Sequence, residues 1–95
     1  MVLQAHTKHA LNREVVFAEL DTEAILLNTT TGIYFGLDDV ATRVWALLDQ
    51  DLTDEQIHAQ ILDEYAVDAD ELRADLRRIL GQLEAHGLIT RSIGD

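Results

Sequence analysis

The hydrophobic period of this chain changes once, at Leu37. Before that point, short β-branched, aromatic and aliphatic runs at 15–20, 24–27 and 33–35 alternate with polar turns. Such runs separated by tight turns are typical of antiparallel strands. After it, apolar residues recur three and four positions apart, which indicates amphipathic helices. The pattern predicts an α+β fold of the winged helix-turn-helix type, with a three-stranded antiparallel sheet followed by three helices.

The three helices have recognisable ends. Asp38 is expected to cap the first, Thr53 with Gln56 to form a capping box on the second, and Asp68 to cap the third. Gly87 is expected to end the third helix in the left-handed conformation. Trp45 is assigned to the core.

A length of 95 residues fits one domain. We expect a flexible lead-in at 1–12, a folded domain at 13–90 and a short tail at 91–95. No apolar stretch is long enough to cross a bilayer, and the N-terminal residues do not read as a secretory signal. The sequence therefore predicts a cytoplasmic protein.

Composition excludes several kinds of chemistry. There is no cysteine, which removes disulfides, thiol catalysis and thiolate metal sites. The single serine, Ser92, is in the tail, so no serine nucleophile with a partner base can be proposed. His6 and His9 fall in the lead-in and are expected to be solvated rather than metal-bound. We expect no catalytic residue, no cofactor and no metal.

The charge balance disfavours nucleic acid. Seven basic and 18 acidic side chains give a net charge of −11, whereas phosphate binding depends on an excess of Lys and Arg. The third helix carries Arg73, Arg77 and Arg78, but its four acidic residues leave it net negative. A winged-helix transcriptional regulator, or another DNA- or protein-binding adaptor, remains the alternative function.

The apolar runs of the predicted sheet suggest a partner. The runs at 24–27 and 33–35 are almost wholly apolar, which indicates a sheet covered on both faces or one face left apolar for a partner. In a simple meander the third run is an edge strand with unpaired N–H and C=O groups. An open edge of this kind suits the addition of a strand from another chain.

Several segments together resemble one family. They are Leu26-Leu27-Asn28, the turn through Thr31-Gly32, Ile33 to Asp38, Val44-Trp45-Ala46-Leu47-Leu48, Thr53 to Ile61, Tyr65 to Asp68, Asp75-Leu76 and His86-Gly87-Leu88-Ile89. In this order they are similar to a PqqD-like domain, and the resemblance extends over roughly residues 13–90.

The resemblance implies a peptide-recognition element for ribosomally synthesised, modified natural products. In that family the leader of a precursor peptide adds as a strand beside the third strand, in a groove against the third helix. The run from Thr31 to Gly36 favours the standalone lasso-peptide type over the quinone-cofactor type. Its expected partners are a leader peptide, a separate leader peptidase and an ATP-dependent macrocyclase. A homodimer through the same edge is not excluded.

The expected binding residues come from the third strand and the third helix. The strand is expected to supply the ladder, and the helix stripe and its margins are expected to line the groove. The predicted residues are Ile33, Tyr34, Phe35, Gly36, Leu72, Arg73, Asp75, Leu76, Ile79 and Leu83.

Overall fold

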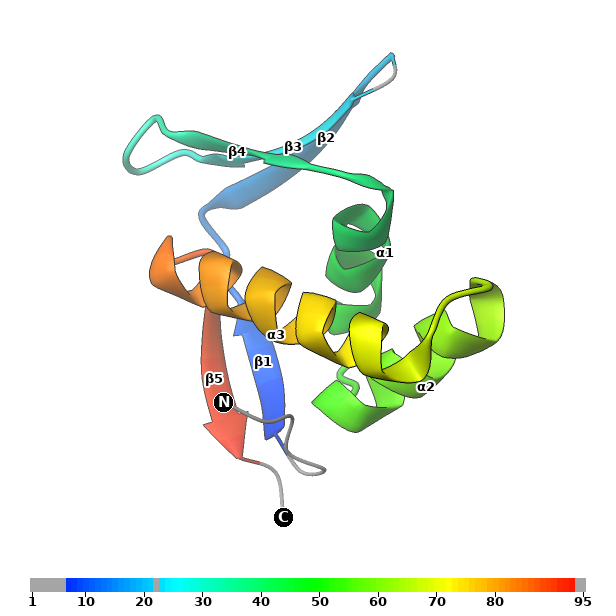
Figure 1. Cartoon of the computed structure of the whole chain (residues 1–95). Helices are drawn as coiled ribbons and strands as arrows, with labels where there is room; N and C mark the ends of the chain where they lie inside the picture. The colour runs from blue at the N-terminus through cyan, green and yellow to red at the C-terminus, as the bar shows by residue number, and fades with distance from the viewer. Residues whose placement is uncertain (1–6, 22, 94–95) are drawn as a thin grey trace.

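A computed structural model describes residues 7–21 and 23–93 (Figure 1). In chain order the elements are β1 (Thr7–Leu11), β2 (Val15–Leu20), β3 (Glu23–Asn28), β4 (Tyr34–Leu37), α1 (Asp39–Leu48), α2 (Asp54–Glu64), α3 (Ala69–Ala85) and β5 (Ile89–Ile93). The predicted α+β architecture, three antiparallel strands followed by three helices, is confirmed.

The three predicted strands form an antiparallel meander in the order β2-β3-β4. Phe17 pairs with Leu26, which in turn pairs with Phe35, so these three side chains share one face of the sheet. Leu26 is completely buried, which identifies this face as the inner one. Both β2 and β4 pair on one side only within the described chain, and each presents an open edge.

A second sheet was not predicted. β1 and β5 pair antiparallel from Thr7 opposite Ile93 to Leu11 opposite Ile89. The expected flexible lead-in at 1–12 and tail at 91–95 are therefore wrong for residues 7–11 and 91–93, whereas 1–6 and 94–95 lie outside the described residues. The signal was hidden because the buried positions of β1 are polar, Thr7 and His9, so the strand shows no hydrophobic alternation.

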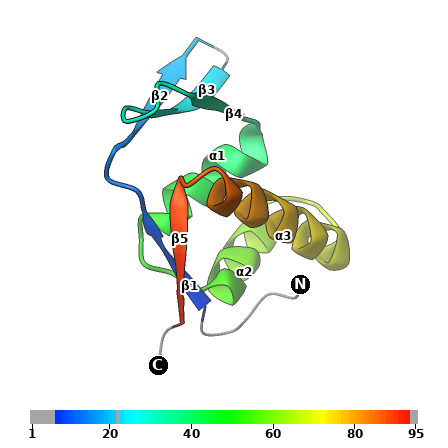
Figure 2. The ribbon, with the colours of Figure 1, turned by 90° about the vertical axis from the view of Figure 1, so that its left-hand side faces the viewer.

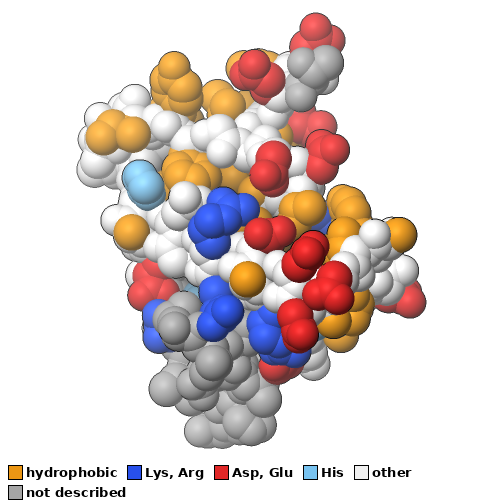
Figure 3. Space-filling view, viewed as in Figure 1, with side chains coloured by type: hydrophobic (Ala, Val, Ile, Leu, Met, Phe, Trp, Pro, Cys, Tyr) orange, Lys and Arg blue, Asp and Glu red, His pale blue; other side chains and the backbone are white. Residues whose placement is uncertain are grey.

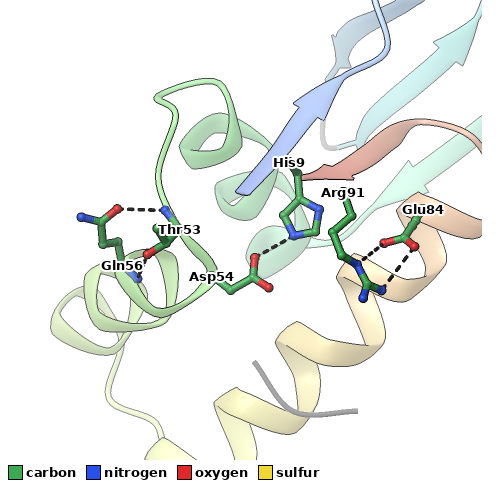
Figure 4. Close-up of polar contacts among 6 residues, drawn as sticks. All are labelled: His9, Thr53, Asp54, Gln56, Glu84 and Arg91. Atoms are coloured by element: carbon green, nitrogen blue, oxygen red, sulfur yellow. Dashed lines mark hydrogen bonds and ion pairs between the residues drawn. The ribbon is translucent and has the colours of Figure 1, made fainter. Parts of the chain in front are cut away.

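The helix ends follow the predicted caps. The Asp38 carboxylate accepts from the Ala41 N–H at 2.8 Å, and both hydrogen bonds of the Thr53 capping box are present (Figure 4). The Asp68 carboxylate accepts from two N–H groups at the start of α3. Gly87 follows the end of α3 with a φ of 70°, as its predicted role requires.

The core lies where the three helices meet the inner face of the meander and the β1–β5 ribbon. Figure 2 shows the meander at one end of the molecule, the ribbon along one side and the helices on the other. Trp45 is buried, as predicted. The fully buried side chains include Leu26, Val44, Leu47, Ile57, Ile61, Leu76, Leu80, Leu83 and Ile89.

His9 is not a solvated histidine. Its Nε2 lies 2.7 Å from the carboxylate of Asp54, the first residue of α2, and both side chains are almost fully buried (Figure 4). The pair ties β1 to the start of α2. His6, the other histidine of the expected lead-in, lies outside the described residues.

Within residues 7–21 and 23–93, none of the helices combines the length and apolar character that a membrane-spanning segment needs.

Candidate functional site

The open edge of β4 is set up by the turn that precedes it. The Asn28 side chain accepts from the N–H groups of Thr30 and Thr31, and Gly32 takes a φ of 75° to complete the reversal. Ile33 and Tyr34 then emerge with 63% and 69% of their surface exposed. A small polar turn therefore presents two large apolar side chains to solvent.

The free hydrogen-bonding groups of β4 can be assigned from its register. The Asn28 N–H donates to the Ile33 carbonyl at 2.9 Å, so residue 33 bonds inward to β3. Hydrogen-bonded and non-bonded positions alternate along an antiparallel pair. The N–H and C=O groups of Tyr34 and Gly36 consequently point away from β3, toward the open edge.

A shallow apolar groove runs between β4 and the C-terminal end of α3. It encloses about 190 Å³. Its walls are Asn28, Thr31, Ile33, Tyr34, Phe35, Ala85, His86 and Leu88. The rings of Phe35 and His86 meet edge to face, with centroids 5.1 Å apart, and join the strand to the helix end. Figure 3 shows hydrophobic side chains gathered over β4 and the turn before it.

His86 offers one free ring nitrogen to the groove. Its Nδ1 lies 2.7 Å from the Gln82 carbonyl, which can only accept, so the Nδ1–H donates. Nε2 is then available to a ligand. The sequence did not assign Ala85, His86 or Leu88 to the site. Only His86 had an available signal: it lies seven positions after Ile79, which was assigned to the site, and so continues that flank of the helix.

The apolar stripe of α3 does not line the groove. These side chains are between 0% and 3% exposed and belong to the core: Leu72, Leu76, Ile79 and Leu83. The expectation that they offer a contact surface to a ligand is not supported, because the three helices and the sheet already cover them. They hold α3 against the rest of the core instead.

The two charged residues expected beside that stripe lie on opposite flanks of α3. Arg73 donates to Glu55 of α2 at 2.6 Å and therefore faces α2, away from β4. Asp75 is exposed, lies 3.8 Å from Arg78 and shares its flank with His86 by helical periodicity. Contact of Asp75 or Arg73 with a ligand stays a prediction, and the position of Asp75 fits it better.

Other chemistry is sparse among the described residues. No group of three or more His, Cys, Asp or Glu side chains could hold a metal there. His58 is buried, with its Nε2 2.9 Å from the Ala69 carbonyl, so it links α2 to α3. The arrangement provides an open backbone edge and an apolar groove, which are features of a binding site.

The fold and the site define a small winged-helix-like α+β domain with an edge strand open beside its last helix. Residues 23–89 match the family described as Coenzyme PQQ synthesis protein D (PqqD), and the chain belongs to this PqqD family. A comparison with curated protein sequences found no match.

Two solved structures are similar to the chain. One is described as "TbiB1 in Complex with the TbiA(beta) Leader Peptide". It shares 40% identity at a TM-score of 0.75, over 83% of this chain and 92% of that one. The other is described as "Lasso peptide synthetase B1 complexed with the leader peptide", with 22% identity and a TM-score of 0.79 over 87% and 98% of the two chains. The second likeness establishes the fold alone.

Proposed function

We propose that this protein binds the leader segment of a ribosomally synthesised precursor peptide of the lasso type, by adding it as a strand beside β4. One observation carries the proposal: the edge that the structure leaves open adjoins an apolar groove. The PqqD family membership and the 40% identical structure, described as a complex with a leader peptide, support it.

Affinity and selectivity would come from different parts of the site. The outward N–H and C=O groups of Tyr34 and Gly36 can bond any extended backbone, so they would supply affinity that depends little on sequence. Alternate side chains of the added strand would face the groove between Phe35 and His86 and would be selected for apolar character. The Nε2 of His86 would select a polar group at the rim.

Glycine at position 36 fits this use. An added Cβ would meet no heavy atom within 4 Å, and the backbone there does not take a positive φ. Neither packing nor conformation within the chain demands glycine. Glycine inside a strand often marks a place where another backbone approaches closely, which is what strand addition requires.

The protein would act without catalysis of its own. The described chain presents a groove and an open strand edge but no assembled set of catalytic side chains. We therefore infer that it delivers its peptide to separate enzymes, a leader peptidase and an ATP-dependent macrocyclase. Reconstituting processing with and without this protein tests delivery. Unchanged processing without it would contradict this part of the proposal.

Calorimetric titration with the leader of the neighbouring precursor tests binding. We expect a Kd between about 10 nM and 10 μM, or about −11 to −7 kcal/mol, because ordering the peptide offsets part of the contact energy. Ile33→Asp should weaken binding at least tenfold by placing a charge against the groove. Val67→Asp is the matched control, since Val67 is also exposed (44%) but lies between α2 and α3. Equal binding by wild type and a folded Ile33→Asp protein would contradict the site.

The structure disfavours the winged-helix regulator. Arg73 and Arg78 on α3 lie beside Glu55 and Asp75, so their charges are already balanced. An anisotropy titration with duplex DNA should show no sequence-selective binding at physiological salt. Submicromolar selective binding would restore the regulator hypothesis.

A further inference from the structure

β2 forms a second open edge, on the opposite side of the meander from β4. Val16, Phe17 and Leu20 on this strand are 51%, 37% and 56% exposed. An apolar, unpaired strand edge promotes aggregation unless it is short, charged, covered by another element or used for binding. The β4 groove leaves this edge unexplained, because β3 separates the two strands.

The free backbone groups of β2 can be assigned as for β4. The Thr29 N–H donates to the Glu14 carbonyl at 2.8 Å, which makes residues 14 and 29 a hydrogen-bonded pair. Every second residue from Glu14 then bonds to β3. The N–H and C=O groups of Phe17 and Glu19 therefore point outward, to the open edge.

A trough adjoins this edge on the inner side of the sheet. It encloses about 360 Å³ between β2 and α1. Its lining residues are Leu11, Phe17, Glu19, Thr42, Trp45, Ala46 and Asp49. Phe17 and Glu19 pair with the buried Leu26 and Ala24, so their side chains point to the trough side. A strand added to β2 would place alternate side chains over the trough.

The charge around the trough indicates what would lie there. Exposed carboxylates gather over the β2–β3 hairpin and near α1 (Figure 3). Four of them make no ion pair with another described residue: Glu19, Asp21, Glu23 and Asp49. Some acidic residues elsewhere are paired, as in the Lys8–Asp51 and Arg43–Glu64 pairs, whereas Asp63, Asp70 and Glu71 make no ion pair with another described residue. The unbalanced charge of the hairpin would favour Lys or Arg in an occupant.

A second copy of this chain suits the edge poorly. Two copies joined through β2 would carry charge of the same sign, and repulsion between like charges opposes their association. Each copy carries a net charge of −11. The occupant is better matched by a different chain.

We propose that the β2 edge and its trough form a docking site for an extended, basic segment of a partner protein that presents both apolar residues and Lys or Arg on the face turned to the trough. The partner's backbone would pair with Phe17 and Glu19, its apolar side chains would cover Phe17 and Trp45, and its cations would meet Glu19 and Asp49. Only the choice of partner rests on the proposed function. That partner is either the leader peptidase or the macrocyclase. The β2 edge could then hold the enzyme while β4 holds the leader.

The test uses the purified leader peptidase and macrocyclase of the same system, each titrated against this protein without leader by biolayer interferometry. Glu19→Pro removes the outward N–H and the carboxylate, yet spares the hydrogen bonds to β3. It should weaken binding of one enzyme at least tenfold, and Glu19→Gln should weaken it by a smaller factor. Val67→Asp should bind as wild type does. Leader affinity, measured separately, should change less than twofold in Glu19→Pro.

Three results would overturn the docking site. They are no binding of either enzyme to wild type, enzyme binding unaffected by Glu19→Pro in a protein that circular dichroism shows to be folded, and a wild-type dimer that Glu19→Pro converts to a monomer. The third would assign the edge to self-association. The leader titration is a separate measurement. If neither enzyme binds, the proposal of leader binding at β4 is unaffected. If wild type does not bind the leader, the proposal of a docking site at β2 is unaffected.

Discussion

At the scale of single residues, a buried polar pair fixes a strand that the sequence did not predict. The side chains of His9 and Asp54 are 3% and 4% exposed. Within the described chain, the His9 ring and the Asp54 carboxylate have only each other as hydrogen-bond partners. A buried carboxylate without a partner is costly, because it has lost its water without compensation. The pair therefore holds β1 against α2.

Replacing His9 with alanine should lower the free energy of unfolding by about 3 kcal/mol, since it leaves Asp54 buried and unpaired. Urea denaturation followed by circular dichroism measures this. Lys8→Ala is the matched control: it removes a neighbouring, solvent-accessible pair with Asp51 and should cost less than about 1 kcal/mol. Equal losses in the two variants would show that the buried pair is unimportant.

Features that depend on neighbouring residues could be predicted from the sequence, whereas contacts between residues far apart in the chain could not. The caps at Asp38, Thr53 and Asp68 were predicted correctly because a cap depends on hydrogen bonds within a few residues. The His9–Asp54 contact spans 45 positions and has no local pattern. The same limit hid His86, whose partner Phe35 lies on a distant strand.

At the scale of elements, one ion pair links α1 to α2. The Arg43 guanidinium donates to both oxygens of Glu64, at 2.7 and 2.5 Å, and Gln60 donates a further hydrogen bond. These hydrogen bonds, with that of Arg43 the largest, lower the pKa of Glu64 from 4.5 to about 2. The same contact raises the pKa of Arg43.

The pH dependence of stability should show this pair. A carboxyl whose pKa is lower in the folded state stabilises it above the unfolded pKa, and this contribution is lost as the pH falls through the folded pKa. Wild type should therefore exceed Arg43→Gln in stability above about pH 4.5, and the difference should shrink below that pH and be lost as the pH falls through about 2. Urea titrations at several pH values measure it. A difference that does not shrink between pH 4.5 and pH 2 would assign the effect to packing of the arginine stem.

The elements also show what periodicity can and cannot predict. The meander and the three helices followed from the change of period at Leu37. The β1–β5 ribbon did not, because its inward positions on β1 are Thr7 and His9. For the site, the four strand residues 33–36 were placed at an open edge. The helix stripe was assigned to both core and groove, but a stripe that fills the core is too deep to touch a ligand.

At the scale of the whole molecule, the charge should shape association. A net charge of −11 favours a leader bearing Lys or Arg, and salt screens the attraction before contact. Raising the salt from about 0.05 to 0.5 M should slow leader association by a larger factor than it speeds release. Stopped-flow fluorescence measures both rates. An association rate that does not depend on salt would contradict electrostatic steering.

Blocking either open edge with proline separates the two sides of the molecule. Because the N–H groups of Gly36 and Glu19 point away from β3, proline at either position should leave the meander intact, as prolines on edge strands do. Circular dichroism and amide spectra of the free variants check that both remain folded.

The calorimetric titration of the leader against Gly36→Pro and Glu19→Pro tests the central claim, that β4 is the leader-binding edge. Gly36→Pro should weaken binding at least tenfold, about 1.4 kcal/mol, while Glu19→Pro should bind as wild type does. If Gly36→Pro does not fold, leader-induced shifts of the Tyr34 and Gly36 amides in the wild-type protein replace it. Undiminished binding by a folded Gly36→Pro protein, or amide shifts confined to β2, would contradict the claim.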